Sequence, residues 1–338
     1  MSADTVLDGR RRGTGQVRRR WGLFSPGVSL LIMLALALIA IGIFMTIDAK
    51  GSWSFIIPFR GRKVLGMVLV GTAIAASTVM FQTITNNRIL TPSIMGFDAL
   101  YLLLKTVLVY FFGSATLSTM NANALFGLEV VAMLVFAGGL FYWLFIVSRR
   151  SLHMLVLVGI VLGLMLRNFT NLLQRVMDPG EFAVLQDSAF ASFNAIPREL
   201  LLVASVLLIL ALIVAWRMRF TLDLLALGRE MAIGLGVNYQ RSVMTALTII
   251  TILVSISTAL VGPITFFGLL VANLAYALVR SYRHATVIAA ASLLAIITLI
   301  GGQLILERVF HFDTSLSVII EFLGGILFIF LLLRGAVK

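Results

Sequence analysis

The sequence predicts an all-α polytopic membrane protein with about ten transmembrane helices. Its 338 residues are 60% hydrophobic and only 12% charged. The apolar residues form runs of roughly 20, which is the length of helix that crosses a hydrocarbon layer about 30 Å thick. Arginines collect in every second gap between these runs, a pattern typical of cytoplasmic loops. The runs are too long and too uniformly apolar to be strands of a barrel.

The order of the runs sets the predicted topology. We expect spans at residues 27–47, 63–84, 93–112, 124–147, 152–173, 197–217, 242–261, 265–280, 285–306 and 316–334. Residues 1–25 form a basic cytoplasmic tail, and residues 26–338 form the membrane domain. The first run resembles a signal peptide, but it is too long and lacks a small-x-small cleavage site, so we expect it to remain as a span. An even number of crossings places both termini in the cytoplasm.

Composition argues against several classes of function. The net charge of +12 comes from basic residues on the inner side, which set topology and allow contact with anionic lipid, so nucleic acid is not an expected partner. There are no cysteines, and His153, His284 and His311 lie on separate loops without metal-ligand spacing. Lys105 precedes a threonine, but Leu104 stands where a phosphate loop needs glycine. We therefore predict no cofactor, no metal site and no catalysis in this chain.

The fifth span carries a polar face. At 100° per residue, four polar side chains and Arg175 fall within an arc of about 120° around the helix. The four are Arg167, Asn168, Asn171 and Gln174. Exposing them to lipid costs several kcal/mol, with about 2.5 to 3.5 kcal/mol for a central arginine alone, so we expect them to face a cavity or protein. The alternative is that Arg167 snorkels outward toward the interface.

Other polar groups inside the spans stand alone in the sequence. Asp98 and Lys105 lie seven residues apart on one face of the third span, where they reach opposite interfaces or bind neighbouring helices. Four further groups are candidates for hydrogen bonds between helices. These are Gln82, Glu129, Gln303 and Glu321.

Three segments interrupt the helical pattern. Residues 82–96, after the second span, are polar and contain a proline and a glycine that end one helix and start another. Residues 227–237, on the same side, contain three glycines, which permit a sharp turn between two short helices. Residues 262–271, on the opposite side, are too few for a separate outer loop and predict a tight re-entrant turn.

The three segments, in this order and spacing, resemble those of the FecCD-like permease subunits of ATP-binding-cassette importers for iron-siderophore complexes, haem and cobalamin. The resemblance covers about residues 27 to 334. Gln82, Pro92 and Gly96 match the family's Q-x-x-x-R-N-P-L-A-x-P-x-x-L-G, while residues 87–90 depart from it. The motif G-P-I-x-F-x-G-L is kept, but Ala272-Asn273 replaces the usual Pro-His. These departures resemble a sub-branch that serves catecholate siderophores and whose permeases often work as unlike pairs.

The resemblance implies both architecture and function. It implies a cobalamin-importer-like permease fold with inverted repeats, hinted at by the Pro-Gly pairs of the second and seventh spans. It implies a permease of the bacterial cytoplasmic (inner) membrane that pairs with a like or unlike second permease and imports a ferric siderophore. Cytoplasmic ATPase subunits would hydrolyse ATP, and an extracytoplasmic substrate-binding protein would deliver the ligand. A cobalamin or haem permease is the alternative within the family.

The resemblance also implies roles for individual residues. The segment gripped by the ATPase comprises Leu227, Gly228, Arg229, Glu230, Ala232, Gly234, Leu235 and Gly236, the alternative being an ordinary glycine-rich loop. The docking site for the binding protein comprises Arg60, Arg62, Lys63 and Arg308, the alternative being anchorage at lipid headgroups. The wall of the translocation pathway comprises Arg167, Asn168, Asn171 and Gln174.

A rival from another class is a gradient-driven secondary transporter. It needs paired intramembrane carboxylates or an ion site in broken helices. We expect Asp98, Glu129 and Glu321 to be too isolated to supply such a site. A membrane-embedded enzyme would need a nucleophile or a metal cluster, and the sequence offers neither.

Overall fold

The computed structural model describes residues 25–49, 51–147, 152–194, 196–279, 281–312 and 314–333. Every regular element in these ranges is a helix. The predicted basic tail lies outside them except for Ser25, as do the last five residues of the chain.

The long helices confirm the all-α polytopic fold class. Within the described ranges, seven helices are long and apolar enough to cross a membrane. They are α1 (Pro26–Thr46), α2 (Trp53–Thr85), α5 (Ala122–Phe141) with its π-helical continuation η2 (Tyr142–Val147), α6 (Leu152–Val176), α8 (Arg198–Arg217), α11 (Tyr239–Val261) and α13 (His284–Arg308). Three shorter helices occupy the other predicted spans: α3 (Phe97–Phe112), α12 (Phe267–Leu278) and α14 (Leu316–Leu333).

Short helices cap the two ends of the bundle. At one end lie α4 (Ser114–Thr119) and α7 (Pro179–Ser188), which the sequence analysis did not predict. They are joined there by the backbone N–H of Ser114, which donates to the Glu181 carboxylate at 2.7 Å. At the other end lie α9 (Arg219–Leu225) and α10 (Arg229–Gly234). A 3-10 turn, η1 (Pro92–Met95), leads into α3.

The start of the second span was predicted wrongly. Helix α2 begins at Trp53, ten residues before the expected 63. The cluster of cations at its start lowers the local hydropathy without preventing helix formation. The extra turns carry exposed aromatic rings, among them Phe55 and Phe59, which stack with centroids 5.7 Å apart.

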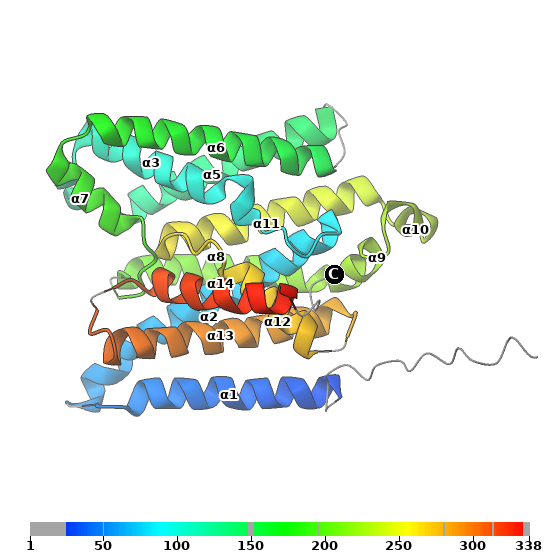
Figure 1. The fold of residues 1–338 in the computed structure, drawn as a ribbon, viewed down its shortest axis with the longest axis horizontal. Coiled ribbons are helices and arrows are strands. Elements are labelled where there is room, and N and C mark those ends of the chain that lie inside the picture. Colours follow the sequence, from blue (N-terminus) through cyan, green and yellow to red (C-terminus); the bar gives the residue numbers. More distant parts are fainter. Residues whose placement is uncertain are drawn as a thin grey trace, which may run out of the picture.

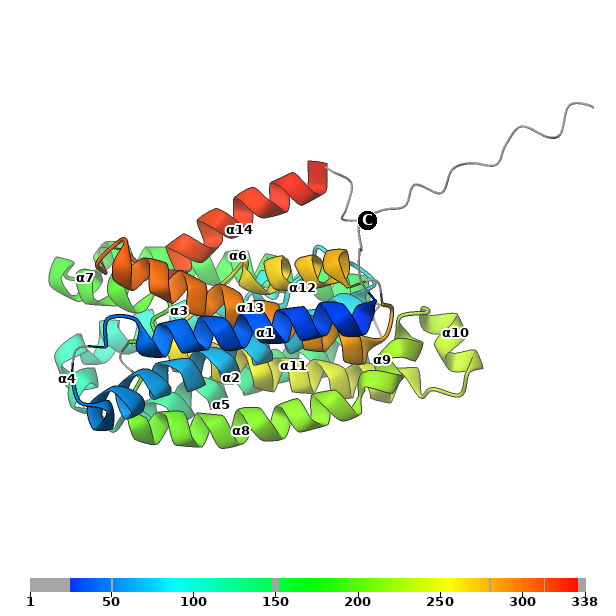
Figure 2. The same cartoon turned by 90° about the horizontal axis from the view of Figure 1, so that it is seen from below.

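The helices are arranged around α2 and α11. Figure 1 shows α3, α5 and α6 on one side of the molecule, α1 and α13 on the other, and α8 and α11 between them. Helix α2 packs against α13, α11 and α8, while α1 lies on α13. In Figure 2, α14 leans away from the rest of the bundle.

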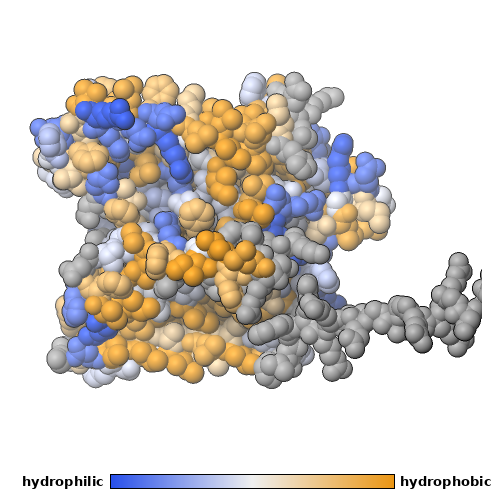
Figure 3. All heavy atoms as spheres, viewed as in Figure 1, coloured by the Kyte–Doolittle hydropathy of each residue, from blue (hydrophilic) through white to orange (hydrophobic). Residues whose placement is uncertain are grey.

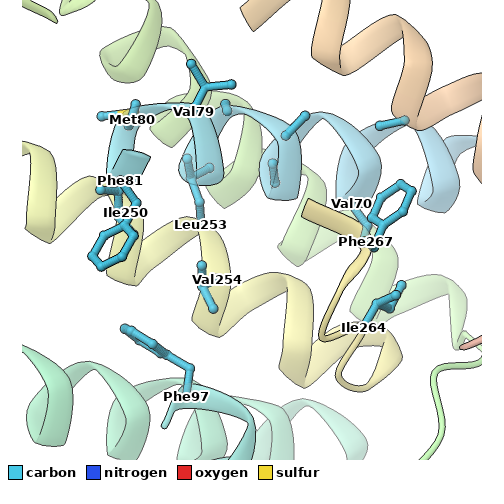
Figure 4. Close-up of a cluster of buried hydrophobic side chains, with 14 of the residues drawn as sticks. Val70, Val79, Met80, Phe81, Phe97, Ile250, Leu253, Val254, Ile264 and Phe267 are labelled. Carbon is cyan, nitrogen blue, oxygen red and sulfur yellow. The ribbon is translucent and has the colours of Figure 1, made fainter. Parts of the chain in front are cut away.

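Burial follows this arrangement. In the most apolar window of each helix, 72% of the residues of α2 and α11 are buried, but only 17% of those of α1. Figure 4 shows part of this core: Phe81 of α2 lies beside Ile250 of α11, while Val79 points to the opposite side of α2. Helix α1 therefore presents most of its apolar surface outward, as expected for a peripheral helix in lipid.

The surface divides into a band and two ends. Figure 3 shows hydrophobic side chains over the middle of the helices, and hydrophilic side chains at the α7 end and the α10 end. A hydrophilic area also runs along α6 from its α7 end into the hydrophobic band. The hydrophobic band suits the lipid interior, whereas the hydrophilic area along α6 is costly to expose to lipid.

Candidate functional site

The segment of residues 227–237 forms an arm beyond the ends of the long helices. In Figures 1 and 2, α9 and α10 project from the bundle at one end. Two glycines make the turns on either side of α10: Gly228 has φ +91° and Gly236 has φ +84°, a region that residues with a Cβ rarely adopt. Ala232 is fully buried and anchors α10, while Leu222 and Leu225 anchor α9.

The outer surface of this arm is both apolar and charged. Leu227, Met231, Ile233 and Leu235 are each more than half exposed. Arg229 and Glu230 are exposed beside them. A contiguous apolar surface outside the lipid band, with charges among it, is typical of a protein docking site.

The structure corrects the role expected for one glycine of the arm. Gly234 was expected to help make the turn, but it lies within helical α10. A Cβ at this position would meet no atom within 4 Å. A side chain there would therefore point into open space on the exposed surface of the arm and leave the arm's own turns intact.

The arm is joined to the core by His284, which the sequence analysis wrongly placed on a loop. His284 is the first residue of α13 and is 4% exposed. Its Nδ1 lies 2.7 Å from Oδ1 of Asp223 on α9. Its Nε2 lies 2.7 Å from the Thr83 hydroxyl on α2. One imidazole thus connects three helices.

The polar face predicted for the fifth span lies on the outside of the subunit. Helix α6 packs on α3 and η1 through Gly159, Gly163, Leu166 and Thr170, all of which are buried. On other faces of the helix, Arg167, Asn168 and Asn171 are exposed and Gln174 is half-buried. Exposing these groups to lipid costs several kcal/mol, so within the membrane contact with a second protein would shield them.

The cluster of cations before the second span has partners within the chain. The Arg60 guanidinium donates to the carbonyls of Phe44 and Ile47, both at 2.8 Å, at the end of α1. The Lys63 ammonium lies 2.9 Å from the Glu307 carboxylate, and the two side chains are only 8% and 14% exposed. The expectation that Lys63 forms part of an exposed patch is therefore wrong, because its ammonium is buried in an ion pair.

The other two cations of the predicted docking site are more accessible. Arg308 pairs with Asp48 at 2.7 Å, and both side chains are at least a third exposed. Arg62 is half-buried and lines a hollow of about 480 Å³ between α2 and α8. Arg198, at the start of α8, lines the same hollow, and the sequence analysis did not connect it with this site. Charge alone gave no signal for Arg198, because Arg62, which lines the same hollow, lies far earlier in the chain.

Two helix breaks meet inside the bundle and bring two carboxylates together. Asp98 lies in the first turn of α3, and Thr265 lies in the turn before α12. The Thr265 hydroxyl donates to Asp98 at 2.9 Å, and its backbone N–H donates to Glu321 of α14 at 3.2 Å. The expectation that Asp98 and Glu321 are isolated is therefore wrong. A small hollow of about 20 Å³ beside Asp98 is lined by further hydroxyls, including those of Thr91 and Ser93.

Of the remaining polar groups of the spans, Lys105 and Glu129 join two helices, as predicted, whereas Gln303 and Gln82 bond to loop residues or within their own helix. Lys105 of α3 pairs with Glu129 of α5 at 2.6 Å. Gln303 donates to Asn194 at 2.9 Å and to Glu307 at 2.8 Å, which places it beside the Lys63 ion pair. Gln82 donates to the carbonyl of Arg88 at 2.7 Å and so closes the break after α2. Among the described residues, no group of three His, Asp or Glu side chains is placed to hold a metal ion.

Known proteins are similar to this chain over almost its whole length. The profile of the FecCD transport family matches residues 27–334. The petrobactin import system permease protein YclO of Bacillus subtilis (strain 168) is 46% identical over 91% of this chain and 97% of its own. The petrobactin import system permease protein FatC of Bacillus anthracis is 34% identical over 96% and 91%. The ferric enterobactin transport system permease protein FepG of Escherichia coli (strain K12) is 27% identical over 94% and 92%.

Solved structures share the fold. A transporter assigned to the metal-chelate ABC type, in an inward-facing conformation, superposes with a TM-score of 0.78 over 92% of this chain and 100% of its own, at 23% identity. PsaBC from Streptococcus pneumoniae, in complex with Fab, superposes with a TM-score of 0.53 at 15% identity, over 87% and 94%. At these identities the likeness supports the helical architecture alone.

Proposed function

Because this chain belongs to the FecCD transport family, we propose that it is the membrane permease subunit of an ATP-binding-cassette importer for a ferric siderophore of the catecholate type. The observation that carries the proposal is the 46% identity, over nearly the full length, to a permease named for petrobactin import. Petrobactin is a catecholate-type siderophore, which agrees with the sub-branch indicated by the residues that follow the second span.

The energy for transport is supplied from outside the chain. Cytoplasmic ATPase subunits bind the exposed face of α10, where Leu227, Arg229, Glu230 and Leu235 surround the buried Ala232. Gly228 and Gly236 hold the turns that present this face. A rigid arm of this kind passes a closing movement of the ATPases to the helices as a rigid-body movement.

The pathway runs between two permeases. The exposed polar face of α6, made by Arg167, Asn168, Asn171 and Gln174, supports this assignment because a second subunit would cover it. Two different relatives from one organism, FatC and FatD of Bacillus anthracis, are both named petrobactin import permeases. A sister permease is therefore the partner that we propose for this chain.

The substrate-binding protein docks at the end of the bundle opposite α10. Of the cations predicted for this role, Arg62 and Arg308 remain suitable, and Arg198 joins them. Lys63 instead stabilises the fold, and Arg60 caps the carbonyl end of α1. The start of α1 and the end of α14 both lie at the α10 end in Figure 1. The proposed location is therefore the cytoplasmic (inner) membrane of a bacterium, with the tail of residues 1–25 and the C-terminus in the cytoplasm.

Uptake into proteoliposomes tests the proposal. The permease is reconstituted with its sister permease and ATPase, the binding protein is loaded with iron-labelled petrobactin, and uptake is measured with and without ATP. We expect uptake to require ATP and an intact ATPase. Uptake driven by an imposed proton or sodium gradient without ATP would instead favour a secondary transporter, in which Asp98 and Glu321 beside Thr265 would be the natural ion site. Competition by haem or cobalamin, with none by petrobactin, would reassign the substrate.

A further inference from the structure

The contact that joins the arm to the core is built from directional hydrogen bonds. Asp223 of α9 accepts two of them at one oxygen, Oδ1: one from the backbone N–H of His284 and one from its Nδ1–H, each at 2.7 Å. The first satisfies an N–H at the start of α13 that has no partner within that helix. The second fixes the orientation of the imidazole ring.

The other side of the ring is held by Thr83. Its hydroxyl lies 2.7 Å from His284 Nε2 and 2.7 Å from the carbonyl oxygen of Val79. A hydroxyl has one proton, so it donates to only one of these two groups at a time. The ring is thereby fixed between a carboxylate on the arm and a hydroxyl on the central helix α2.

The contact continues toward the helix break after α2. The Tyr276 side chain of α12 lies near the Thr83 hydroxyl. The Arg88 guanidinium lies over the Tyr276 ring, 4.5 Å from its centroid. The carbonyl of Arg88 accepts hydrogen bonds from Gln82 and Asn273, at 2.7 and 3.1 Å. These contacts place the His284 site beside the segment that begins the third span.

Apolar packing alone would not fix the orientation of the arm relative to the core. Helix α9 also packs on α2 and α13 through Leu222 and Leu225, which are almost fully buried. Such contacts hold the arm close but tolerate sliding, whereas short, directional hydrogen bonds to the buried imidazole fix its angle. His284 lies at the only point described where polar groups of α9, α13 and α2 meet.

We propose that His284 is a positioning residue that transmits movement of the arm to α2, with Asp223 and Thr83 as its two attachments. The inference rests on the proposed function, because it assumes that the arm binds an ATPase. Without the imidazole, the ATPases still bind and hydrolyse ATP, but closing of the arm no longer moves the core helix.

The test measures uptake of iron-labelled petrobactin per ATP hydrolysed in the reconstituted importer. For His284→Ala and Asp223→Ala, we expect assembly and ATP hydrolysis to stay near the wild-type values, while uptake per ATP falls about tenfold, within the usual range of coupling between sites. Asp223→Asn keeps an oxygen that accepts both bonds, so we expect it to retain most of the coupling.

Two threonines of α2 provide a matched comparison. Thr83→Val removes the hydroxyl that meets His284. Thr85→Val removes one that bonds only within its own helix, to the Phe81 carbonyl at 2.7 Å and the Gln82 carbonyl at 3.4 Å. We expect Thr83→Val to lower uptake per ATP and Thr85→Val to leave it unchanged. Because both act through one contact, Thr83→Val combined with His284→Ala should be no worse than His284→Ala alone.

Three outcomes would overturn the inference. The first is an unchanged uptake per ATP in His284→Ala. The second is an equal effect of Thr83→Val and Thr85→Val. The third is a loss of uptake and hydrolysis in the same proportion, which would indicate a structural role only. Failure of the proposed function looks different, since the wild-type importer would then show no ATP-dependent uptake of petrobactin at all.

Discussion

At the scale of single residues, burial decides what a cation does. Lys63 and Arg62 are neighbours in sequence, yet Lys63 faces Glu307 in the interior while Arg62 lines an open hollow between α2 and α8. Phe59 and Phe312 lie over the Lys63 ammonium, at 5.0 and 5.8 Å from their centroids, and exclude water from the pair. Truncating one partner of such a pair leaves the other charge buried and uncompensated.

Lys63→Ala should therefore destabilise the protein strongly. We expect a loss of about 3 to 5 kcal/mol, the usual cost of removing one partner of a buried ion pair. Arg308→Ala is the matched control: its pair with Asp48 is 34% and 43% exposed, and removing it should cost only about 0 to 1 kcal/mol. Unfolding of the purified protein in detergent, followed by circular dichroism, measures both. Equal losses in the two variants would contradict the distinction drawn from burial.

Arg62→Glu should weaken docking of the binding protein without affecting the fold. Its guanidinium bonds only locally, to the Pro58 carbonyl at 3.1 Å, so reversal removes little internal structure. Opposed charges at a rim act mainly on the association rate, and we expect that rate to fall about tenfold at low salt. Surface plasmon resonance with the petrobactin-binding protein measures it. Arg60→Glu is a poor probe, because it would also remove bonds to the end of α1. An unchanged rate for Arg62→Glu would remove Arg62 from the docking site.

At the scale of elements, two glycines let α6 approach the break before α3. A Cβ on Gly163 would lie 2.9 Å from the Cα of Gly96, and one on Gly159 would lie 3.0 Å from a Met95 side-chain carbon. Small residues four apart on a helix allow this kind of close backbone approach in membranes. The same contact orients α6 so that its polar face points away from α3.

Gly163→Ala should accordingly destabilise the contact between α6 and η1. The atom that the new methyl group meets is backbone, which cannot rotate aside, so we expect a cost of about 1 to 3 kcal/mol. Gly138→Ala, in α5, is the control, because a Cβ there meets no atom within 4 Å and alanine favours the helix by about 1 kcal/mol. Thermal unfolding of both variants checks the prediction. A neutral Gly163→Ala would show that the two backbones are not in close contact.

Hydropathy and periodicity predicted the spans and the polar face of α6, because both are properties of consecutive residues. The contact at His284 was missed because its partners lie 61 and 201 residues away. The pairing of Asp98 with Thr265 spans 167 residues and was missed for the same reason. The start of α2 was misplaced because hydropathy, unlike helix propensity, falls at Arg60, Arg62 and Lys63.

At the scale of the whole molecule, the proposed sites for the ATPase and the binding protein lie at opposite ends of the bundle. Figure 1 places α10 at one end, and the junction between α1 and α2 at the other. The hydrophobic band in Figure 3 lies between them. A permease driven by a cytoplasmic ATPase and supplied by an extracytoplasmic protein requires this separation.

Cysteine labelling tests whether the two ends face opposite sides of the membrane. The chain contains no cysteine, so a single introduced thiol is labelled without background. Glu230, exposed on α10, and Ser52, exposed at the start of α2, are suitable positions. With a membrane-impermeant maleimide on intact cells or spheroplasts, we expect Ser52→Cys to react and Glu230→Cys to react only after permeabilisation. As a control, both variants are also labelled after denaturation, which shows that each introduced thiol is present and reactive. The two residues are separated by the full apolar band, so labelling of both from one side would mean that the helices cross the membrane differently from the proposed topology. That result would contradict the proposed ATPase site, the proposed docking site and the proposed role of His284 together.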